Sequence, residues 1–268
     1  MNKRLEGKVA VVTGCGSSGP GWGNGKAIAT LLSRMGASVF GCDVNLAAAS
    51  ETKELIDREG GRIQISGCDV ADPLAVEGLI KTCIEIYGDI DILVNNVGIA
   101  RLGGAVELDL ADWRTVMDVN VTSMFLTAKY TIPSMLRKGS GSIVNIGSVA
   151  GVRDSGVPYI SYSASKAAVL GLSRSIAMQY AKNKIRSNVL MPGLMNTPMI
   201  QVPSTNLSAG YKSANVEEML EKRNQQCPTG EMGDAWDVAY TTLWLASDEA
   251  KYITAAEIVV DGGLTARV

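Results

Sequence analysis

Histidine is absent from this chain of 268 residues, and its absence excludes more chemistry than any other feature of the composition. Without an imidazole there can be no Ser-His-Asp or Cys-His catalytic group, no histidine metal ligand and no histidine general base. Proton transfer must use tyrosine, lysine, cysteine, aspartate or glutamate. We therefore expect no metal site, and we expect acid–base chemistry from one of these other residue types.

Cysteine is scarce, and its spacing favours free thiols. No two cysteines form a C-x-x-C pair, so neither a structural zinc nor a disulfide framework is expected. Free thiols are typical of a reducing compartment, and the N-terminal residues Met1–Lys8 lack the hydrophobic segment of a signal peptide. We therefore expect a cytoplasmic protein. The five cysteines are Cys15, Cys42, Cys68, Cys83 and Cys227.

Long hydrophobic runs and an excess of positive charge are also missing. The apolar runs are short and broken, far below the ~20 residues that a membrane-spanning helix needs. The net charge is −2, which provides no basic surface for nucleic acid or an acidic membrane. We therefore expect a small-molecule substrate, with no nucleic-acid or membrane partner.

The chain does contain a regular alternation of short apolar segments and longer helical patterns. Strands are expected at Lys8–Thr13, Ser38–Asp43, Arg62–Ser66, Ile90–Asn95, Ser142–Ile146, Arg186–Met191 and Glu257–Asp261. Helices are expected at Lys26–Met35, Leu46–Glu59, Pro73–Tyr87, Leu110–Arg137 with an interruption at Pro133, Tyr159–Lys182 and Asp234–Ala246. This alternation predicts an α/β fold, a Rossmann-like, doubly wound parallel sheet of seven strands with helices on both faces.

The domain organisation is expected to be simple. No linker or charge run divides the chain, so residues 1–268 are predicted to form a single domain. The segment Pro198–Met232 is the exception, because it is polar, interrupted by proline and weakly periodic. It is expected to carry its own short helix at Val216–Arg223 and to form a lid over the substrate.

A glycine-rich segment follows the first expected strand. From Thr13 to Lys26 the sequence reads T-G-C-G-S-S-G-P-G-W-G-N-G-K. Glycine lets the backbone approach a phosphate closely, and the next helix would offer unpaired N–H groups to a pyrophosphate. Asp43 ends the second strand, 18 residues after Gly25, where a carboxylate can accept hydrogen bonds from ribose hydroxyls. This order of elements predicts dinucleotide binding.

A tyrosine and a lysine lie one helical turn apart, at Tyr162 and Lys166. A nearby ammonium and a cationic nicotinamide ring are expected to favour the phenolate and to lower the phenol's pKa from its ordinary value near ~10, which makes Tyr162 a usable proton shuttle. Ser148 follows the fifth strand at the carboxyl edge of the sheet, where its hydroxyl can donate to a carbonyl oxygen. Asn120 lies inside a helical pattern, where a buried amide must hold backbone or water. Each residue alone has a plain structural explanation, so only the combination indicates a reaction.

Together these residues resemble the short-chain dehydrogenase/reductase family, including its 3-oxoacyl-carrier-protein reductase-like members, over nearly the whole chain. No single motif is specific, but the ordered set is. The resemblance implies a Rossmann-like sheet, NAD or NADP, interconversion of alcohols and carbonyl compounds, and homotetramers or homodimers. The matching motifs are Thr13-Gly14, Asp69-Val70, Asn95-Asn96-x-Gly98, Asn120, Ser148, Tyr162-x-x-x-Lys166, Pro192-Gly193, Thr197 and Asp261-Gly262-Gly263.

The same resemblance implies a role for each catalytic residue. Tyr162 would be the acid/base, and Lys166 would hold the nicotinamide ribose and tune the phenol. Ser148 would hold the reacting oxygen, and Asn120 would position a water that continues the proton path from Lys166.

The resemblance also implies the cofactor contacts. Asp69-Val70 would line the adenine, and Asn96 with Gly98 would border the adenosine ribose and the middle of the groove. Pro192-Gly193 and Thr197 would lie along the nicotinamide. The complete set of expected cofactor-binding residues is Gly14, Gly23, Asn24, Asp43, Val44, Asp69, Val70, Asn96, Gly98, Tyr162, Lys166, Pro192, Gly193, Met195 and Thr197.

Three positions depart from the family pattern. The loop between Gly14 and Gly23 is longer than usual, which leaves the phosphate contacts of Cys15–Trp22 open. Val97 replaces the common alanine and narrows the space near the cofactor. The spacing from Ser148 to Tyr162 is one residue longer than usual. None of these changes removes a catalytic group.

We predict an NAD-dependent oxidoreductase that transfers a hydride between NAD(H) and a secondary alcohol or ketone. Asp43 favours NAD, because the 2′-phosphate of NADP would meet its carboxylate. A 3-oxoacyl-carrier-protein reductase is the alternative within the family, and Asp43 disfavours it because that reaction usually runs on NADPH. A non-catalytic dinucleotide-binding redox sensor is the alternative of another class, and the intact catalytic set argues against it. A mostly apolar substrate pocket is expected from Leu102, Val149, Arg153, Val157, Leu194 and Met199.

Overall fold

Seven parallel strands form one sheet in the order β3-β2-β1-β4-β5-β6-β7. The computed structural model describes residues 3–154, 156–201 and 207–267. The strand order reverses between β1 and β4, and in open parallel sheets such a reversal opens a ligand crevice at the carboxyl ends of the strands. The strands are β1 (Val9–Thr13), β2 (Ser38–Asp43), β3 (Arg62–Gly67), β4 (Ile92–Asn95), β5 (Gly141–Ile146), β6 (Ile185–Pro192) and β7 (Glu257–Val260).

The helices follow the strands in alternation, as the sequence predicts. Within the described ranges no helix is long and apolar enough to span a bilayer. The α-helices are α1 (Asn24–Arg34), α2 (Leu46–Arg58), α3 (Pro73–Tyr87), α4 (Leu110–Met117), α5 (Ser123–Lys138), α6 (Ile160–Tyr180), α7 (Leu207–Gly210), α8 (Val216–Gln226) and α9 (Ala235–Ala246). Short 3₁₀ helices span Val149–Gly151, Ala181–Asn183, Pro198–Gln201, Asp248–Ala250 and Leu264–Ala266.

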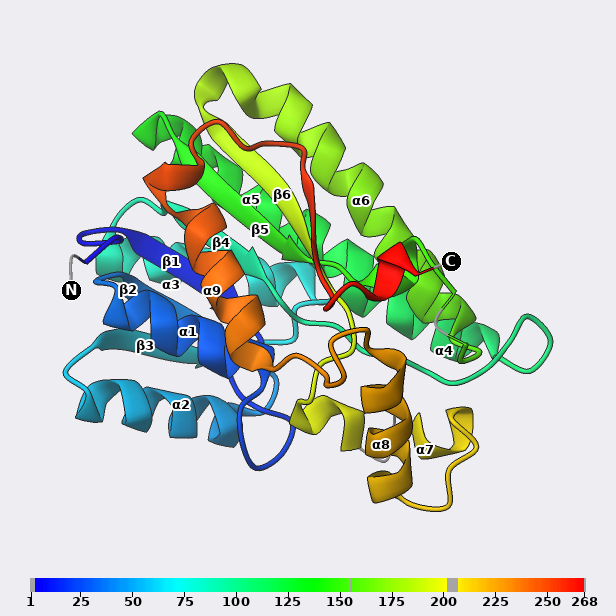
Figure 1. Ribbon diagram of the computed structural model, residues 1–268. Helices are drawn as coiled ribbons and strands as arrows, with labels where there is room; N and C mark the ends of the chain where they lie inside the picture. Colours follow the sequence, from blue (N-terminus) through cyan, green and yellow to red (C-terminus); the bar gives the residue numbers. More distant parts are fainter. Residues whose placement is uncertain (1–2, 155, 202–206, 268) are drawn as a thin grey trace.

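Both faces of the sheet are buried, and β1 shows how. Ala10 and Val12 point into a core shared with α1, α2 and α9, whereas Val9 and Val11 point into a core shared with α3 and α5. In Figure 1 the first group of helices lies in front of the sheet and α3 and α5 lie behind it. A strand that is covered on both sides can be apolar at every position, and all five residues of β1 are buried. The predicted doubly wound α/β fold is confirmed.

The long helix expected at Leu110–Arg137 differs from the structure in the position of its break. Pro133 lies inside the continuous helix α5. The interruption lies earlier, where Asp118–Thr122 forms one π-helical turn between α4 and α5. Asn120 sits in this turn, and π-helical turns are frequent at functional sites.

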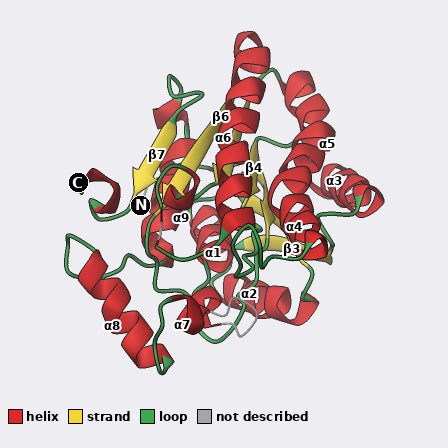
Figure 2. Ribbon diagram, turned by 90° about the vertical axis from the view of Figure 1, so that its right-hand side faces the viewer, coloured by secondary structure: helices red, strands yellow, loops and turns green. Residues whose placement is uncertain are grey.

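The segment Pro198–Met232, expected to form a lid, contains α7 and α8 beyond the carboxyl ends of the strands. Both helices stand apart from the layered body, at the lower right of Figure 1 and the lower left of Figure 2. Their buried side chains Leu207 and Met219 pack in one apolar cluster with Tyr159 and Tyr162 of the α6 region. The part of the predicted lid at residues 202–206 lies outside the described residues.

Candidate active site at the carboxyl edge of the sheet

Ser148, Tyr162 and Lys166 lie together where β5 meets α6. The ammonium Nζ of Lys166 donates to the main-chain oxygen of Ile146, the last residue of β5, at 2.8 Å. Ser148 follows two residues later, and its hydroxyl is hydrogen-bonded to the Tyr162 phenol. Lys166 Nζ also lies 5.6 Å from the centre of the Tyr162 ring. The structure thus joins three residues that the sequence singled out separately.

Burial is the main influence on the electrostatics of this group. Burial raises the pKa of Tyr162, and the hydrogen bond with Ser148 and the charge of Arg223 act in the opposite direction. The ammonium of Lys166, 5.6 Å from the centre of the phenol ring, donates to the Ile146 carbonyl and is itself deeply buried. Burial lowers the pKa of Lys166 to about 8. Tyr162 is therefore a protonated phenol at neutral pH, and Ser148 and Arg223 stabilise its anion.

Asn120 is fully buried and holds the backbone at Ile99. Its Oδ1 accepts from the Ile99 N–H at 2.8 Å, and its Nδ2 donates to the Ile99 carbonyl at 2.9 Å and to Ser165 Oγ at 2.9 Å. Ser165 Oγ in turn donates to the Tyr162 carbonyl at 2.8 Å. Asn120 thus ties the loop after β4 to the first turn of α6, which carries Tyr162.

The loops that follow β1 and β4 pack closely against each other. Asn96 donates from Nδ2 to the carbonyls of Thr13 at 3.2 Å and Gly14 at 3.0 Å. Gly14 has φ +65°, a conformation that favours glycine. A Cβ at Gly98 would lie 3.1 Å from Lys166 Nζ, so only a bare backbone passes this close to the ammonium. Glycine at these two positions therefore lets neighbouring side chains, including the ammonium of Lys166, pack directly against the main chain.

The start of α1 has the donors that a pyrophosphate needs. Gly23 is its N-cap and provides no side-chain hydrogen bond, whereas Asn45 and Asp72 cap α2 and α3 with their side chains. The first N–H groups of α1 are therefore left for an anion. In the same turn, Asn24 Oδ1 is buried without a hydrogen-bond partner among the described residues. This uncapped helix start fits the phosphate part of a dinucleotide.

Asp43 lies at the end of β2 beside the glycine-rich loop. Its Oδ2 accepts from the Gly16 N–H at 3.0 Å, and its Oδ1 accepts from the Asn45 N–H at 2.9 Å. Each carboxylate oxygen can accept a further hydrogen bond. Within the described ranges no Lys or Arg forms an ion pair with Asp43. Val44 follows and is 80% exposed.

The other expected cofactor residues line the same edge. Val70 is buried, and Asp69 is exposed, with its Oδ1 accepting from the Ala71 N–H at 2.9 Å. Pro192 ends β6, and Gly193 packs so closely on Asp261 that a Cβ would lie 2.6 Å from the aspartate Cβ. The side chain of Met195 packs instead in the core with α9.

The lengthened glycine loop reaches the segment that follows β6. A Cβ at Gly19 would contact Pro198 at 3.3 Å, and Pro20–Trp22 shares a cavity of about 220 Å³ with Thr197. Trp22 also packs against Trp236 of α9, with ring centres 4.7 Å apart and ring planes tilted by 58°. The extra residues of this loop therefore wall one side of the groove at Thr197.

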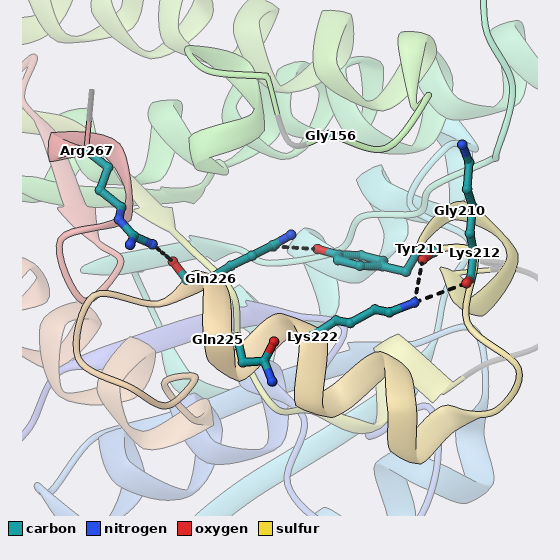
Figure 3. Close-up of a pocket in the computed structure, with 8 residues that line it drawn as sticks. All are labelled: Gly156, Gly210, Tyr211, Lys212, Lys222, Gln225, Gln226 and Arg267. Atoms are coloured by element: carbon teal, nitrogen blue, oxygen red, sulfur yellow. Dashed lines mark hydrogen bonds between the residues drawn. The ribbon is translucent and has the colours of Figure 1, made fainter.

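A larger pocket of about 510 Å³ opens beside α7 and α8 (Figure 3). Tyr211 crosses it, with its hydroxyl donating to Gln226 Oε1 at 3.2 Å, and Lys222 Nζ donates to the Lys212 carbonyl at 3.1 Å. The pocket does not include Ser148, Tyr162 or Lys166, so it lies outside the reaction centre. Its lining residues are Gly156, Gly210, Tyr211, Lys212, Lys222, Gln225, Gln226 and Arg267.

The expected substrate pocket is partly different in the structure. Leu102 and Val157 do pack beside Tyr162. Val149 instead packs with Met124 and Val169 in a separate apolar cluster, and Arg153 is exposed.

Sequence reasoning missed Arg223, which is buried on α8 next to Tyr211. The sequence contains one indication of its burial, because this cation comes four residues after Met219 and so falls on the apolar side of a short helix.

In the described part of the chain, no group of three or more cysteines and carboxylates is placed to hold a metal ion. The five cysteines are buried and free.

Comparison with known proteins gives consistent results along nearly the whole chain. A family model described as enoyl-(acyl carrier protein) reductase, of the short-chain alcohol dehydrogenase type, matches residues 21–265. The crystal structure of a short-chain dehydrogenase/reductase from Burkholderia xenovorans, whose name marks the assignment as putative, has a TM-score of 0.92 and 43% identity, with 99% of both chains covered.

Two curated relatives have named activities. Cyclohexanol dehydrogenase of an Acinetobacter species is 34% identical over 100% of this chain and 98% of its own length. The 3-oxoacyl-(acyl-carrier-protein) reductase FabG of Vibrio cholerae is 34% identical over 97% of this chain and 98% of its own length. With the sheet order, the Ser148–Tyr162–Lys166 group and these matches, the chain belongs to the short-chain dehydrogenase/reductase family of oxidoreductases.

Proposed function

We propose that this protein is an NAD-dependent dehydrogenase/reductase that interconverts a secondary alcohol and a ketone, with Tyr162 as the acid/base. The observation that carries the proposal is the contact of the Tyr162 phenol with Ser148 beside Lys166. A bound nicotinamide dinucleotide supplies the chemistry of hydride acceptance and donation at its ring. The chain's own residues must then hold the substrate oxygen and move one proton.

The protonated phenol of Tyr162 donates its proton to the substrate oxygen in the reductive direction and recovers it in the oxidative direction. Ser148 Oγ accepts from the Ala150 N–H at 3.1 Å, which fixes the hydroxyl beside the Tyr162 phenol, and its proton would turn from the phenol to the reacting oxygen when substrate binds. As charge develops on that oxygen, two donors stabilise it. Lys166, anchored to Ile146, holds the ribose and keeps a positive charge within reach of the phenol ring.

Asn120 would act on the proton path through its main chain. Its side-chain amide already has three hydrogen bonds to Ile99 and Ser165. A water that continues the path from Lys166 would therefore be held by the main chain of Asn120 in the π-helical turn.

The dinucleotide would lie along the carboxyl edge, from β2 to the segment after β6. The α1 start with Gly14, Gly23 and Asn24 would hold the pyrophosphate, and Asp69 and Val70 would border the adenine. Asp43 would accept from the ribose hydroxyls of NAD. Because no cation pairs with Asp43 in the described ranges, the 2′-phosphate of NADP would face an uncompensated carboxylate.

The lid, the assembly and the location complete the proposal. Residues 198–232 would close over the substrate, because their apolar side chains already pack beside Tyr162.

A homotetramer or homodimer is supported by exposed apolar side chains on α4 and α5, of which Leu110 is 61% and Phe125 51% exposed. The free, buried cysteines suit a reducing cytoplasm.

A 3-oxoacyl-carrier-protein reductase is the second candidate, favoured by the likeness to FabG. The relative that acts on cyclohexanol favours a small alcohol instead. The test is a panel of secondary alcohols, ketones and a 3-oxoacyl thioester, with absorbance of NADH and NADPH as the readout. Turnover of alcohols with NAD supports the proposal, and turnover of the thioester with NADPH alone would overturn it.

A further inference from the structure

Three charged side chains are almost fully buried among the described residues, and one of them has no counterion. Asp91 is 5% exposed and pairs with Lys138 at 2.6 Å. Lys166 is 3% exposed and belongs to the reaction centre. Arg223 is 6% exposed, and no Asp or Glu of the described chain forms an ion pair with it. None of the remaining residues, 1–2, 155, 202–206 and 268, is an acidic type.

The contacts of Arg223 are neutral and weak. Its Nε donates to the sulfur of Met232 at 3.2 Å, and its Nη1 donates to the Tyr211 hydroxyl at 3.4 Å. The guanidinium also lies 5.6 Å from the centre of the Tyr211 ring. A guanidinium has more N–H donors than these contacts use, and burying a charge without a charged partner is costly. At a solvent-exposed position on α8 the same cation would have a smaller desolvation cost.

Arg223 occupies the side of α8 that faces the reaction centre. Met219, one turn earlier on the same helix, is fully buried in the apolar cluster that contains Tyr162 and Tyr159. Tyr211, the partner of Arg223, packs in the same cluster. Burial raises the pKa of Tyr159 and Tyr162, and the charge of Arg223 opposes this in both residues. The guanidinium is therefore electrostatically close to the catalytic phenol.

We propose that Arg223 binds a carboxylate of the substrate, so that the enzyme acts on a hydroxy acid or keto acid rather than on a neutral alcohol. The planar guanidinium suits a carboxylate, which it can bind through two parallel hydrogen bonds. This inference rests on the proposed function, because it assigns the substrate class of the same site.

A carboxylate matches the surroundings better than a phosphate does. One guanidinium carries one positive charge, and Met219, Leu220 and Tyr211 around it are apolar or neutral. A phosphate dianion would leave excess negative charge in this cluster, next to a phenol that must ionise during the reaction. A substrate carboxylate also places its hydroxyl or carbonyl carbon at a fixed distance from Arg223, which orients it toward Tyr162.

The first test measures binding without turnover. Cyclohexanecarboxylate and the neutral cyclohexanecarboxamide, neither of which has an alcohol to oxidise, are titrated calorimetrically into the holoenzyme with NADH. Wild-type protein should bind the carboxylate at least ~10-fold more tightly than the amide, as a charge-assisted hydrogen-bonded pair implies. Arg223→Met, which keeps the length and apolar packing, should abolish this difference. Arg223→Lys should retain part of it. Equal binding of both ligands by wild-type protein would overturn the proposal.

The second test measures turnover with matched substrates. Hydroxycyclohexane carboxylate should exceed its methyl ester in kcat/KM. Arg223→Met removes a charge that also favours the Tyr162 phenolate, so turnover of both substrates should fall, but the loss on the acid should exceed the loss on the ester by ~10-fold or more. Lys222→Met is the matched control, because it removes a neighbouring exposed cation that pairs with Glu218 at 2.8 Å. It should leave the preference intact. An equal loss in Lys222→Met would indicate a diffuse positive field and contradict a specific site at Arg223.

These outcomes separate the two proposals. If neutral alcohols and ketones are turned over without any preference for the acid, the proposed function stands and the role of Arg223 is wrong. If no compound is turned over but the carboxylate binds through Arg223, the anion site stands and the proposed reaction is wrong. Circular dichroism and thermal unfolding of each variant distinguish lost recognition from lost folding.

Discussion

Lys166 Nζ donates a hydrogen bond to the main-chain oxygen of Ile146 at 2.8 Å, joining the second turn of α6 to the last residue of β5. Ser148 lies two residues beyond this joint, and Tyr162 lies one helical turn before Lys166. The bond therefore fixes the distance between the strand that positions the serine and the helix that positions the tyrosine. Its cost is a buried ammonium, because desolvation lowers the pKa of Lys166 to about 8.

The pH dependence of stability should report this buried lysine. In the unfolded chain Lys166 has the ordinary pKa of 10.5, and in the folded protein about 8. Between these values the unfolded state binds more protons, so the folded state gains stability as pH rises. Across this window the free energy of unfolding of wild-type protein, relative to Lys166→Met, should increase by about 3 kcal/mol. Urea denaturation of both proteins at a series of pH values measures it, and a constant difference would contradict the burial of the ammonium.

Asn120 should be a structural requirement of the site as well as part of the proton path. Asn120→Ala leaves the Ile99 N–H and carbonyl without their partner, which should lower the free energy of unfolding by ~2–3 kcal/mol. Urea denaturation measures the loss. Thr122→Ala is the control in the same π-helical turn, since its hydroxyl makes only an exposed contact with Asp118 at 3.3 Å. Equal effects of the two substitutions would argue against the role of Asn120 in holding Ile99.

The fold and the reaction centre are largely predictable from the sequence, because their signals are local. Strand alternation and a Tyr–Lys pair at helical spacing are visible in the chain itself, and Tyr162, Lys166 and Ser148 do lie together. The tertiary effects are not visible there. Pro133 looks like a helix break, but the break lies at Asn120, where a long-range hydrogen bond to Ile99 compensates the π-helical turn.

The pKa values of the site also depend on tertiary packing. The sequence places an ammonium beside Tyr162, but the fold directs that ammonium to Ile146, and burial dominates the pKa of both groups. Arg223 could not be assigned to the site, because only the packing of α8 against the Tyr162 cluster brings a residue 61 positions away to the phenol.

Cofactor choice should depend on Asp43. Contact between its carboxylate and a 2′-phosphate, with the loss of a charge-assisted hydrogen bond, should cost ~2–4 kcal/mol. Wild-type enzyme should therefore prefer NAD over NADP by at least ~30-fold in kcat/KM. Asp43→Ser should narrow the gap, mainly by improving the use of NADP. Steady-state kinetics with both cofactors measure this, and equal use of NADPH and NADH by wild-type enzyme would refute the assignment of Asp43.

Ligand binding should slow the motions of the proposed lid. α8 packs on the cluster around Tyr162 through Met219, so a substrate analogue with NADH should protect its amides from hydrogen exchange. Helix α2, whose buried residues pack in the core with α1 and α9 and not in the Tyr162 cluster, should change much less and serves as the internal reference. Mass-spectrometric hydrogen exchange with and without ligands tests this, and unchanged exchange in α8 would count against a lid.

The assignment of Tyr162 as the acid/base is tested most directly by Tyr162→Phe, which removes one oxygen atom and leaves the ring packing. The initial rate of NADH formation from a secondary alcohol is measured for both proteins, with calorimetry of NADH binding as the control. Turnover by Tyr162→Phe should fall ~10²–10⁴-fold, because the proton-transfer group is lost. NADH affinity should be nearly unchanged, since the contacts are spread along the groove. Retention of more than about a tenth of wild-type turnover would contradict the account and assign the proton transfer to another group.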